Sequence, residues 1–298
     1  ALTVVMLVLL GLALFYTVIG GMISVVLTDY VQFVVLSIGL LVATGFAAHA
    51  LGWDHVFARM EELKGPAGFD PFQSESGFGW EYVIWMFFLG LVNCALWPTA
   101  VARALASESE TVVRRQFMWT SLSFAIRTLI PYFWGICAFV FIMETPTLKT
   151  VFFPGEADAA SVDSLYAMPV FLARVLPTGL LGLIMAGMIA AFISTHDSYF
   201  LCWSSVLTND VAVPLFRGQM SEKAKILLTR ILVIIIGAAI FLVSYAFPLR
   251  EDLWDFMAVT GAIYFTGAFA LLVGGLYWKR ASTIGAYLAL TAGGFAVL

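Results

Sequence analysis

The feature that most constrains this chain is a series of about eight apolar segments, each close to the length at which a helix spans a bilayer. They run near 2–19, 22–48, 80–105, 112–143, 177–208, 224–247, 252–278 and 284–298. The chain is 62% hydrophobic and 11% charged, whereas soluble domains are roughly 45–50% apolar and about 25% charged. The sequence therefore predicts an all-α polytopic membrane protein with a single transmembrane domain over residues 1–298.

The connections between the segments differ in charge. Basic residues gather in 103–116, 209–223 and 279–283, and the positive-inside rule places these stretches in the cytoplasm. The longer connections at 49–79 and 144–176 are rich in acidic residues and are expected outside. This alternation fits a chain that crosses one membrane many times.

Three local features refine this arrangement. Gly20-Gly21 leaves no room for a loop, so the first two segments are expected to form a hairpin. The prolines of 144–176 leave two alternatives, an external lid that carries a short helix or a plain loop. His55 is expected to be solvated or interfacial. Both ends of the chain fall in apolar stretches without a signal-peptide pattern, so an internal fragment of a longer protein is expected.

A polar run, Ser194-Thr195-His196-Asp197-Ser198, interrupts the apolar segment 177–208. A carboxylate at mid-membrane costs at least about 2.5 kcal/mol, so the run should face the protein interior or a wet cavity and mark an ion or solute path. Helical spacing aligns Ala191 with most of the run, whereas His196 points the other way and cannot complete a hydrolytic triad. The polar face continues through Cys202, Ser205 and Thr208.

This column of oxygens fits a hard cation such as sodium better than zinc or iron. The alternative is that Ser194 and Thr195 bond back to carbonyls of their own helix.

Asp29 and Asp197 lie about 13 Å and about 16 Å from the cytoplasmic surface at 1.5 Å per residue. If they face each other, they form a coupled acidic site for a cation or a proton; otherwise Asp29 is hydrogen-bonded to helix ends near the hairpin.

Arg127 is a lone basic residue well inside a helical segment. A guanidinium there either clamps a carboxylate or another anion of the solute, or forms a structural ion pair. The acidic residues that could pair with it are Asp29, Asp197 and Glu144.

A helix break is expected in 80–105, where Pro98 removes the amide that would reach back to the carbonyl of Cys94. Interrupted helices often form the solute site of transporters, which makes Asn93 and Trp97 candidates; a proline kink without a ligand is the alternative. The Trp97 ring is either a stacking surface or a packing residue.

Several classes of function are excluded. The net charge of −4 with no basic cluster offers nothing to nucleic acid. Cys94, Cys137 and Cys202 lie in apolar segments without metal-ligand spacing. No nucleophile and base share a face, so the chain is not expected to be an enzyme.

Three ordered motifs resemble the solute:sodium symporters, a family that includes sodium-coupled sugar, proline and sialic acid transporters. They are Tyr16–Gln32, Ala190–Thr195 followed by Ser204–Asp210, and Trp278–Ala286. The resemblance implies the LeuT-like inverted-repeat transporter fold. By motif order, this chain would hold core helices four to ten and part of the next helix.

The resemblance also implies two ion sites. The main sodium site would use the carbonyl of Ala191 with the hydroxyls of Ser194 and Thr195. The second site of some members matches the three residues Asp29, Asp197 and Ser198. Those members carry a hydroxyl where Asp197 stands, so the extra carboxylate would either tighten a second cation or bind a proton.

At the solute site, Met257 stands where the sugar branch carries a glutamine, which makes sugar a less favoured solute. Arg127 matches a lysine of that branch that contacts the substrate, and an arginine there indicates an anionic solute. Arg127, Asn93, Trp97 and Met257 are thus the substrate-binding candidates.

The function expected from the sequence is that of a sodium-coupled secondary active symporter that imports a small organic solute across the plasma (inner) membrane. No cofactor is expected, with Na⁺, or alternatively H⁺, as the coupling ion. The expected partners are the solute and the bilayer, and no oligomeric state is predicted. The alternative is a transporter-like membrane sensor that binds ion and solute without transport.

Overall fold

The computed structural model describes residues 2–65, 68–73, 79–154, 162–246 and 253–295. The chain divides into two compact units, which are considered separately. Unit 1 comprises Ala1–Asp70 with Ser107–Gly237, and unit 2 comprises Pro71–Ala106 with Ala238–Leu298.

Unit 1 is built around the first helix of the chain and the helix that carries the polar run. Its helices are α1 (Leu2–Leu51), α2 (Trp53–Lys64), α5 (Glu110–Glu144), α6 (Pro146–Phe152), η3 (Ser164–Tyr166), α7 (Ala167–Val175), α8 (Thr178–Val206), η4 (Leu207–Ala212), α9 (Val213–Leu215) and the start of α10 (Glu222–Ala246). η4 is a π-helix, which extends α8 without a break.

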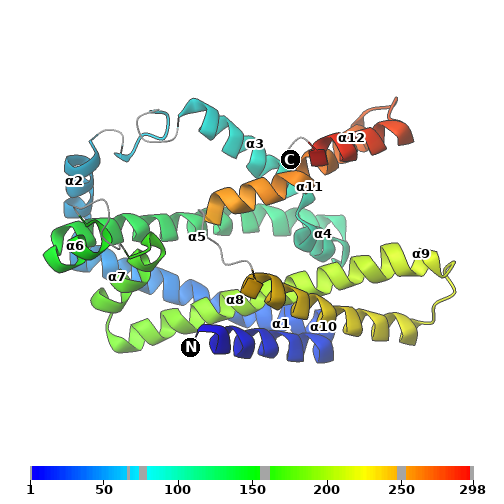
Figure 1. Cartoon of the computed structure of the whole chain (residues 1–298), viewed down its shortest axis with the longest axis horizontal. Helices are drawn as coiled ribbons and strands as arrows, with labels where there is room; N and C mark the ends of the chain where they lie inside the picture. Colours follow the sequence, from blue (N-terminus) through cyan, green and yellow to red (C-terminus); the bar gives the residue numbers. More distant parts are fainter. Residues whose placement is uncertain (1, 66–67, 74–78, 155–161, 247–252, 296–298) are drawn as a thin grey trace. The chain divides into compact units, whose positions relative to one another are not determined.

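The helix α1 consists of two arms that meet at Gly21. This residue has φ 59° and ψ −154°, which is not helical and which a glycine adopts without the strain a side chain would add. The chain turns back there, as Figure 1 shows. The predicted hairpin at Gly20-Gly21 is therefore confirmed.

The arms of α1 pack closely against α8 and α10 because small residues line the contacts. A Cβ added at Gly187 of α8 would lie 3.2 Å from Leu36 Cδ1, and one at Gly237 of α10 would lie 2.5 Å from Leu14 Cδ2. Small residues of this kind let helix backbones approach each other in membranes, where apolar burial does not drive association. This close packing brings polar side chains of α1 to the polar run of α8.

The apolar core of unit 1 lies among α1, α2, α5, α7 and α8. Phe171 and Val56 are fully buried there, and Trp134 is 2% exposed. The Trp134 indole Nε1 donates to Thr44 Oγ1 at 3.0 Å, so the one polar atom of this buried ring is satisfied. Burial of such aromatic side chains contributes several kcal/mol each.

The two connections that were expected outside the membrane contain helices. Stretch 144–176 holds α6, η3 and α7, so the plain-loop alternative is wrong; residues 155–161 lie outside the described part. Stretch 49–79 holds α2, which the sequence interpretation did not anticipate. The α2 helix was hidden because its charged residues resemble those of a solvated loop.

Unit 2 contains α3 (Trp80–Leu96), α4 (Pro98–Leu105), α11 (Leu253–Tyr277) and α12 (Thr283–Phe295), together with the end of α10. Trp97 separates α3 from α4 with an extended backbone, at φ −63° and ψ 109°. Pro98 follows at the first position of α4, where its missing amide costs no helical hydrogen bond. The predicted break of this helix at Pro98 is therefore confirmed.

Six helical spans in the described residues are long and apolar enough to cross a membrane. They are Thr3–Leu51, Trp80–Leu105, Glu110–Glu144, Thr178–Leu215, Glu222–Ala246 and Thr260–Tyr277. The first is folded back at Gly21 and so accounts for two of the predicted segments, and α12 matches the last one. Large apolar side chains along these spans remain exposed to the surroundings, as lipid-facing residues do.

Candidate ion and solute sites

Asp197 lies at the centre of the contact between α8 and the first arm of α1. Its side chain is fully buried. The Tyr16 hydroxyl of α1 donates to Asp197 Oδ2, and the hydroxyl oxygen of the neighbouring Ser198 lies 3.2 Å from Oδ1. The Tyr16 hydrogen bond stabilises the charged form of the carboxylate, which burial alone would disfavour.

Asp29 reaches the same polar run from the second arm of α1. Ser194 Oγ donates to Asp29 Oδ1 at 2.5 Å, within the range of charge-assisted hydrogen bonds between a hydroxyl and a carboxylate. The two arms of the hairpin thus bring Tyr16 to Asp197 and Asp29 to Ser194, one turn apart on α8. Each acidic residue is bound to a hydroxyl from the opposite helix.

The other hydroxyls of the polar run bond within α8. Thr195 Oγ1 donates to the Ala191 carbonyl at 2.8 Å, and Ser198 Oγ donates to the Ser194 carbonyl at 2.7 Å. The back-bonding alternative therefore describes Thr195, whereas Ser194 turns to Asp29 instead. The Thr195 bond also holds two of the predicted main-site oxygens beside each other, with lone pairs remaining on both.

His196 packs on its own helix. Its Nδ1 lies 2.8 Å from the Phe192 carbonyl, which accepts the hydrogen bond, and its ring is 4.1 Å from that of Phe192. This position separates the imidazole from the acidic residues that meet α1. His196 has no contact here that would activate Ser194.

The polar face that continues beyond the polar run, through Cys202, Ser205 and Thr208, is packed at two of these residues. Cys202 and Thr208 are buried, and Thr208 Oγ1 lies 3.0 Å from Thr229 Oγ1 of α10. Ser204, which was not predicted, is also fully buried on this part of α8. An ion leaving in this direction would first have to separate α8 from α10.

Tyr16 and Gln32 are polar residues of the site that the sequence interpretation did not single out. Both lie in the first motif, and Gln32 is one helical turn after Asp29. The Gln32 Oε1 atom is buried and accepts no hydrogen bond within the described part of the chain. Their polar character inside an apolar segment was the signal that could have found them.

Arg127 is exposed on α5, with its guanidinium over the Phe33 ring at 5.8 Å from the centroid. Within the described residues, it forms no ion pair with the three carboxylates considered for it. This cation–π contact leaves its N–H donors available to an anion.

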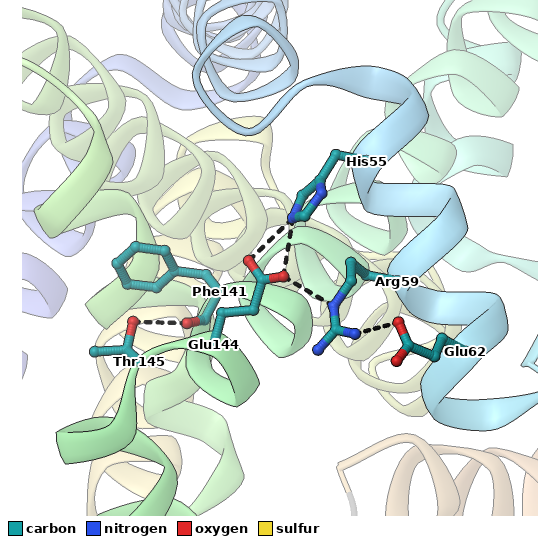
Figure 2. Close-up of polar contacts among 6 residues, drawn as sticks. All are labelled: His55, Arg59, Glu62, Phe141, Glu144 and Thr145. Carbon is teal, nitrogen blue, oxygen red and sulfur yellow. Dashed lines mark hydrogen bonds and ion pairs between the residues drawn. The ribbon is translucent and has the colours of Figure 1, made fainter.

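Glu144, at the end of α5, binds two residues of α2 instead (Figure 2). His55 Nε2 donates to its carboxylate at 2.9 and 3.1 Å, and Arg59 Nε donates at 2.9 Å. The hydrogen bond that Arg59 donates to Glu62 raises the pKa of the guanidinium further above its usual value. We name His55, Arg59, Glu62 and Glu144 the α2–α5 clamp. The His55 side chain is 48% exposed.

In unit 2, two of the solute-binding candidates, Asn93 and Trp97, lie at the break between α3 and α4. Asn93 Oδ1 is buried and unpaired within the described residues, while the Asn93 carbonyl accepts from the Trp97 amide at 2.9 Å. The Trp97 ring stacks on Phe265 with centroids 6.0 Å apart, which supports the packing role. Met257, on α11, is 44% exposed.

A family model named the sodium:solute symporter family matches residues 1–293. The chain belongs to this family. Sodium/myo-inositol cotransporter 2 of Oryctolagus cuniculus is 24% identical over 306 residues, covering 96% of this chain and 45% of that protein. The sodium/glucose cotransporter of Vibrio parahaemolyticus is 22% identical over 305 residues, covering 95% and 55% respectively. The chain therefore spans about half the length of these relatives.

A solved structure of a sodium-coupled symporter shares the fold of this chain. It is a Na⁺-coupled sialic acid symporter in a substrate-bound, outward-open state, which reveals a novel Na⁺ site in that protein. The TM-score is 0.72 at 18% identity, and the match covers 99% of this chain and 66% of the other. The predicted LeuT-like fold is thereby confirmed, and so is the membership in a family of membrane transporters, not enzymes.

Proposed function

We propose that this sodium:solute symporter chain belongs to a secondary active transporter in which inward sodium flow drives uptake of a small organic solute. The observation that carries the proposal is the cluster of oxygens that α8 presents to α1, with Ser194 bound to Asp29 at 2.5 Å. Oxygen ligands of this kind suit a hard monovalent cation. Family membership supports sodium as that cation.

The main sodium site would use the carbonyl oxygen of Ala191 and the hydroxyl oxygens of Ser194 and Thr195. Sodium there would replace the bond from Thr195 to the Ala191 carbonyl and would draw Ser194 away from Asp29. Asp29, Asp197 and Ser198 would form the second site, for a second cation or for a proton.

Coupling requires only that sodium bind two conformations of the protein unequally. The packed face around Thr208 and Thr229 would close the inward path in one conformation, and separation of α8 from α10 would open it in the other. A hydrogen bond between two threonines is weak enough in a membrane, about 0.6 kcal/mol on average, to be broken during a transport cycle.

The solute would be small and, from Arg127, anionic. The candidates that would contact it are Arg127, Asn93, Trp97 and Met257. The relatives include transporters named for myo-inositol and glucose. The symporter of similar fold is a Na⁺-coupled one named for sialic acid, which is itself an acid. Two features favour an acid over a neutral sugar as the solute. The guanidinium of Arg127 is exposed, and Met257 stands where the sugar branch of the family carries a glutamine.

Uptake into proteoliposomes tests the proposal. The full-length protein is reconstituted under an inward sodium gradient, and labelled carboxylates, amino acids and sugars are offered in turn. We expect uptake of one class to depend on sodium, and the Ser194→Ala variant to need a much higher sodium concentration. Ser121→Ala, which changes an exposed hydroxyl of α5, is the matched control.

Two results would contradict the proposal in different ways. Uptake that needs neither sodium nor Ser194 would exclude sodium coupling through this site. Sodium-dependent solute binding without any uptake would favour the alternative of a membrane sensor that binds ion and solute. Uptake at the plasma membrane of intact cells would check the proposed location.

A further inference from the structure

Tyr16 is placed to act on the ion chemistry of Asp197. The carboxylate is fully buried, and the Tyr16 hydroxyl is the donor that reaches it from another helix. In the described part of the chain, no lysine or arginine pairs with Asp197. A buried anion without a cationic partner depends on its hydrogen-bond donors for stabilisation.

The groups that face Asp197 come from α1 and α8. Tyr16 donates to it, the Ser198 hydroxyl oxygen lies 3.2 Å from it, and Asp29, held by Ser194, adds a second negative charge from the other arm of the hairpin. His196 is turned to Phe192 and does not contact it. The carboxylates of Asp29 and Asp197 together would bind a positive charge tightly unless another interaction offsets that attraction.

We propose that Tyr16 is the residue that sets how tightly Asp197 holds its positive ligand, by donating to the carboxylate whenever that ligand leaves. The inference rests on the proposed function, since it names a further residue of the same ion site. The ligand is Na⁺, bound at the carboxylate of Asp197. Tyr16 would thus make release possible at a position where a carboxylate replaces a hydroxyl.

The direction of the effect follows from which state Tyr16 stabilises. A donor lowers the free energy of the charged carboxylate and gives nothing comparable to a carboxylate already neutralised by a cation or a proton. Removal of the hydroxyl therefore destabilises only the ligand-free state. The Tyr16→Phe variant should bind its positive ligand more tightly, by about tenfold or more, as expected for loss of a hydrogen bond to a charged group.

The test uses the full-length transporter in proteoliposomes, with sodium varied at one fixed pH. Tyr16→Phe lowers the half-saturating sodium concentration about tenfold. Tyr30→Phe, at a tyrosine 67% exposed on the other arm of α1, should leave this concentration unchanged.

A second comparison separates this role from simple packing. In an Asp197→Asn background the carboxylate charge is gone, and Tyr16→Phe should no longer tighten the binding of sodium. A difluorotyrosine placed at position 16 keeps the ring and the hydroxyl but donates more strongly, and it should weaken ligand binding. This variant also serves if Tyr16→Phe does not reach the membrane.

Unchanged sodium dependence in both Tyr16 variants, with a sodium-driven wild type, would overturn the inference alone. Weaker binding by Tyr16→Phe would overturn it too, because it would make Tyr16 a ligand and not a competitor. A wild type without sodium-driven uptake would instead remove the proposed function. The three results are distinguishable in the same set of vesicles.

Discussion

The closest backbone approach in unit 2 gives a prediction whose size can be worked out from the structure. A Cβ added at Gly293 of α12 would lie 2.4 Å from the Gly267 amide nitrogen and 2.6 Å from its Cα. Both atoms belong to the backbone of α11, so no side-chain rotation relieves the contact. To reach an ordinary separation of 3.4 Å, the helices must move apart by about 1 Å (3.4 − 2.4).

Gly293→Ala is therefore expected to destabilise the protein. Overpacking of this kind costs about 1–3 kcal/mol. Gly294→Ala is the matched control, because nothing lies within 4 Å of a Cβ there and the gain in helix propensity is about the same, up to ~1 kcal/mol. The difference between the two variants isolates the contact with α11.

Thermal unfolding of the purified full-length protein in detergent measures this difference. We expect Gly293→Ala to unfold several degrees below Gly294→Ala, at about 2–4 °C per kcal/mol for a domain of roughly 150–250 residues. Equal unfolding temperatures would refute the reasoning, because they would mean that α11 and α12 do not approach at Gly267.

Two further predictions concern unit 1. Glu144→Gln should loosen the α2–α5 clamp and speed amide hydrogen exchange in Trp53–Lys64, at a cost in stability below about 1 kcal/mol because the ion pairs are partly exposed. Glu61→Gln, the control, should leave the exchange unchanged. Equal protection in both variants would contradict the clamp. Phe171→Ala should lower stability by about 3–5 kcal/mol, since Phe171 is fully buried against Phe141; denaturation that matches Leu165→Ala, which removes a side chain 65% exposed, would refute it.

The helices and their breaks follow from local sequence because lipid leaves the backbone few choices. A backbone surrounded by hydrocarbon must satisfy its own hydrogen bonds, so long apolar runs become helices. Gly21 and Pro98 interrupt them for reasons contained in one residue each, a positive φ and a missing amide. These elements could be predicted without knowledge of any neighbour.

The side-chain partners could not be predicted in the same way. Helical periodicity shows that Ser194 and Asp197 share a region of α8, but it does not show which arm of α1 each one meets. Tyr16 and Asp197 are 181 positions apart, and Glu144 meets His55 and Arg59 across 89 and 85 positions. Such contacts depend on the lateral packing of whole helices, which small differences at glycine positions decide.

The hairpin of α1 has a mechanical consequence for the two acidic residues. Tyr16 lies on one arm and Asp29 on the other, and both meet a single turn of α8 through Asp197 and Ser194. A tilt of the hairpin against α8 would stretch both hydrogen bonds together, because the arms are joined at Gly21 and cannot move far apart. Binding of an ion at Asp29 or Asp197 would then affect the other residue through the movement of the hairpin as well as through charge.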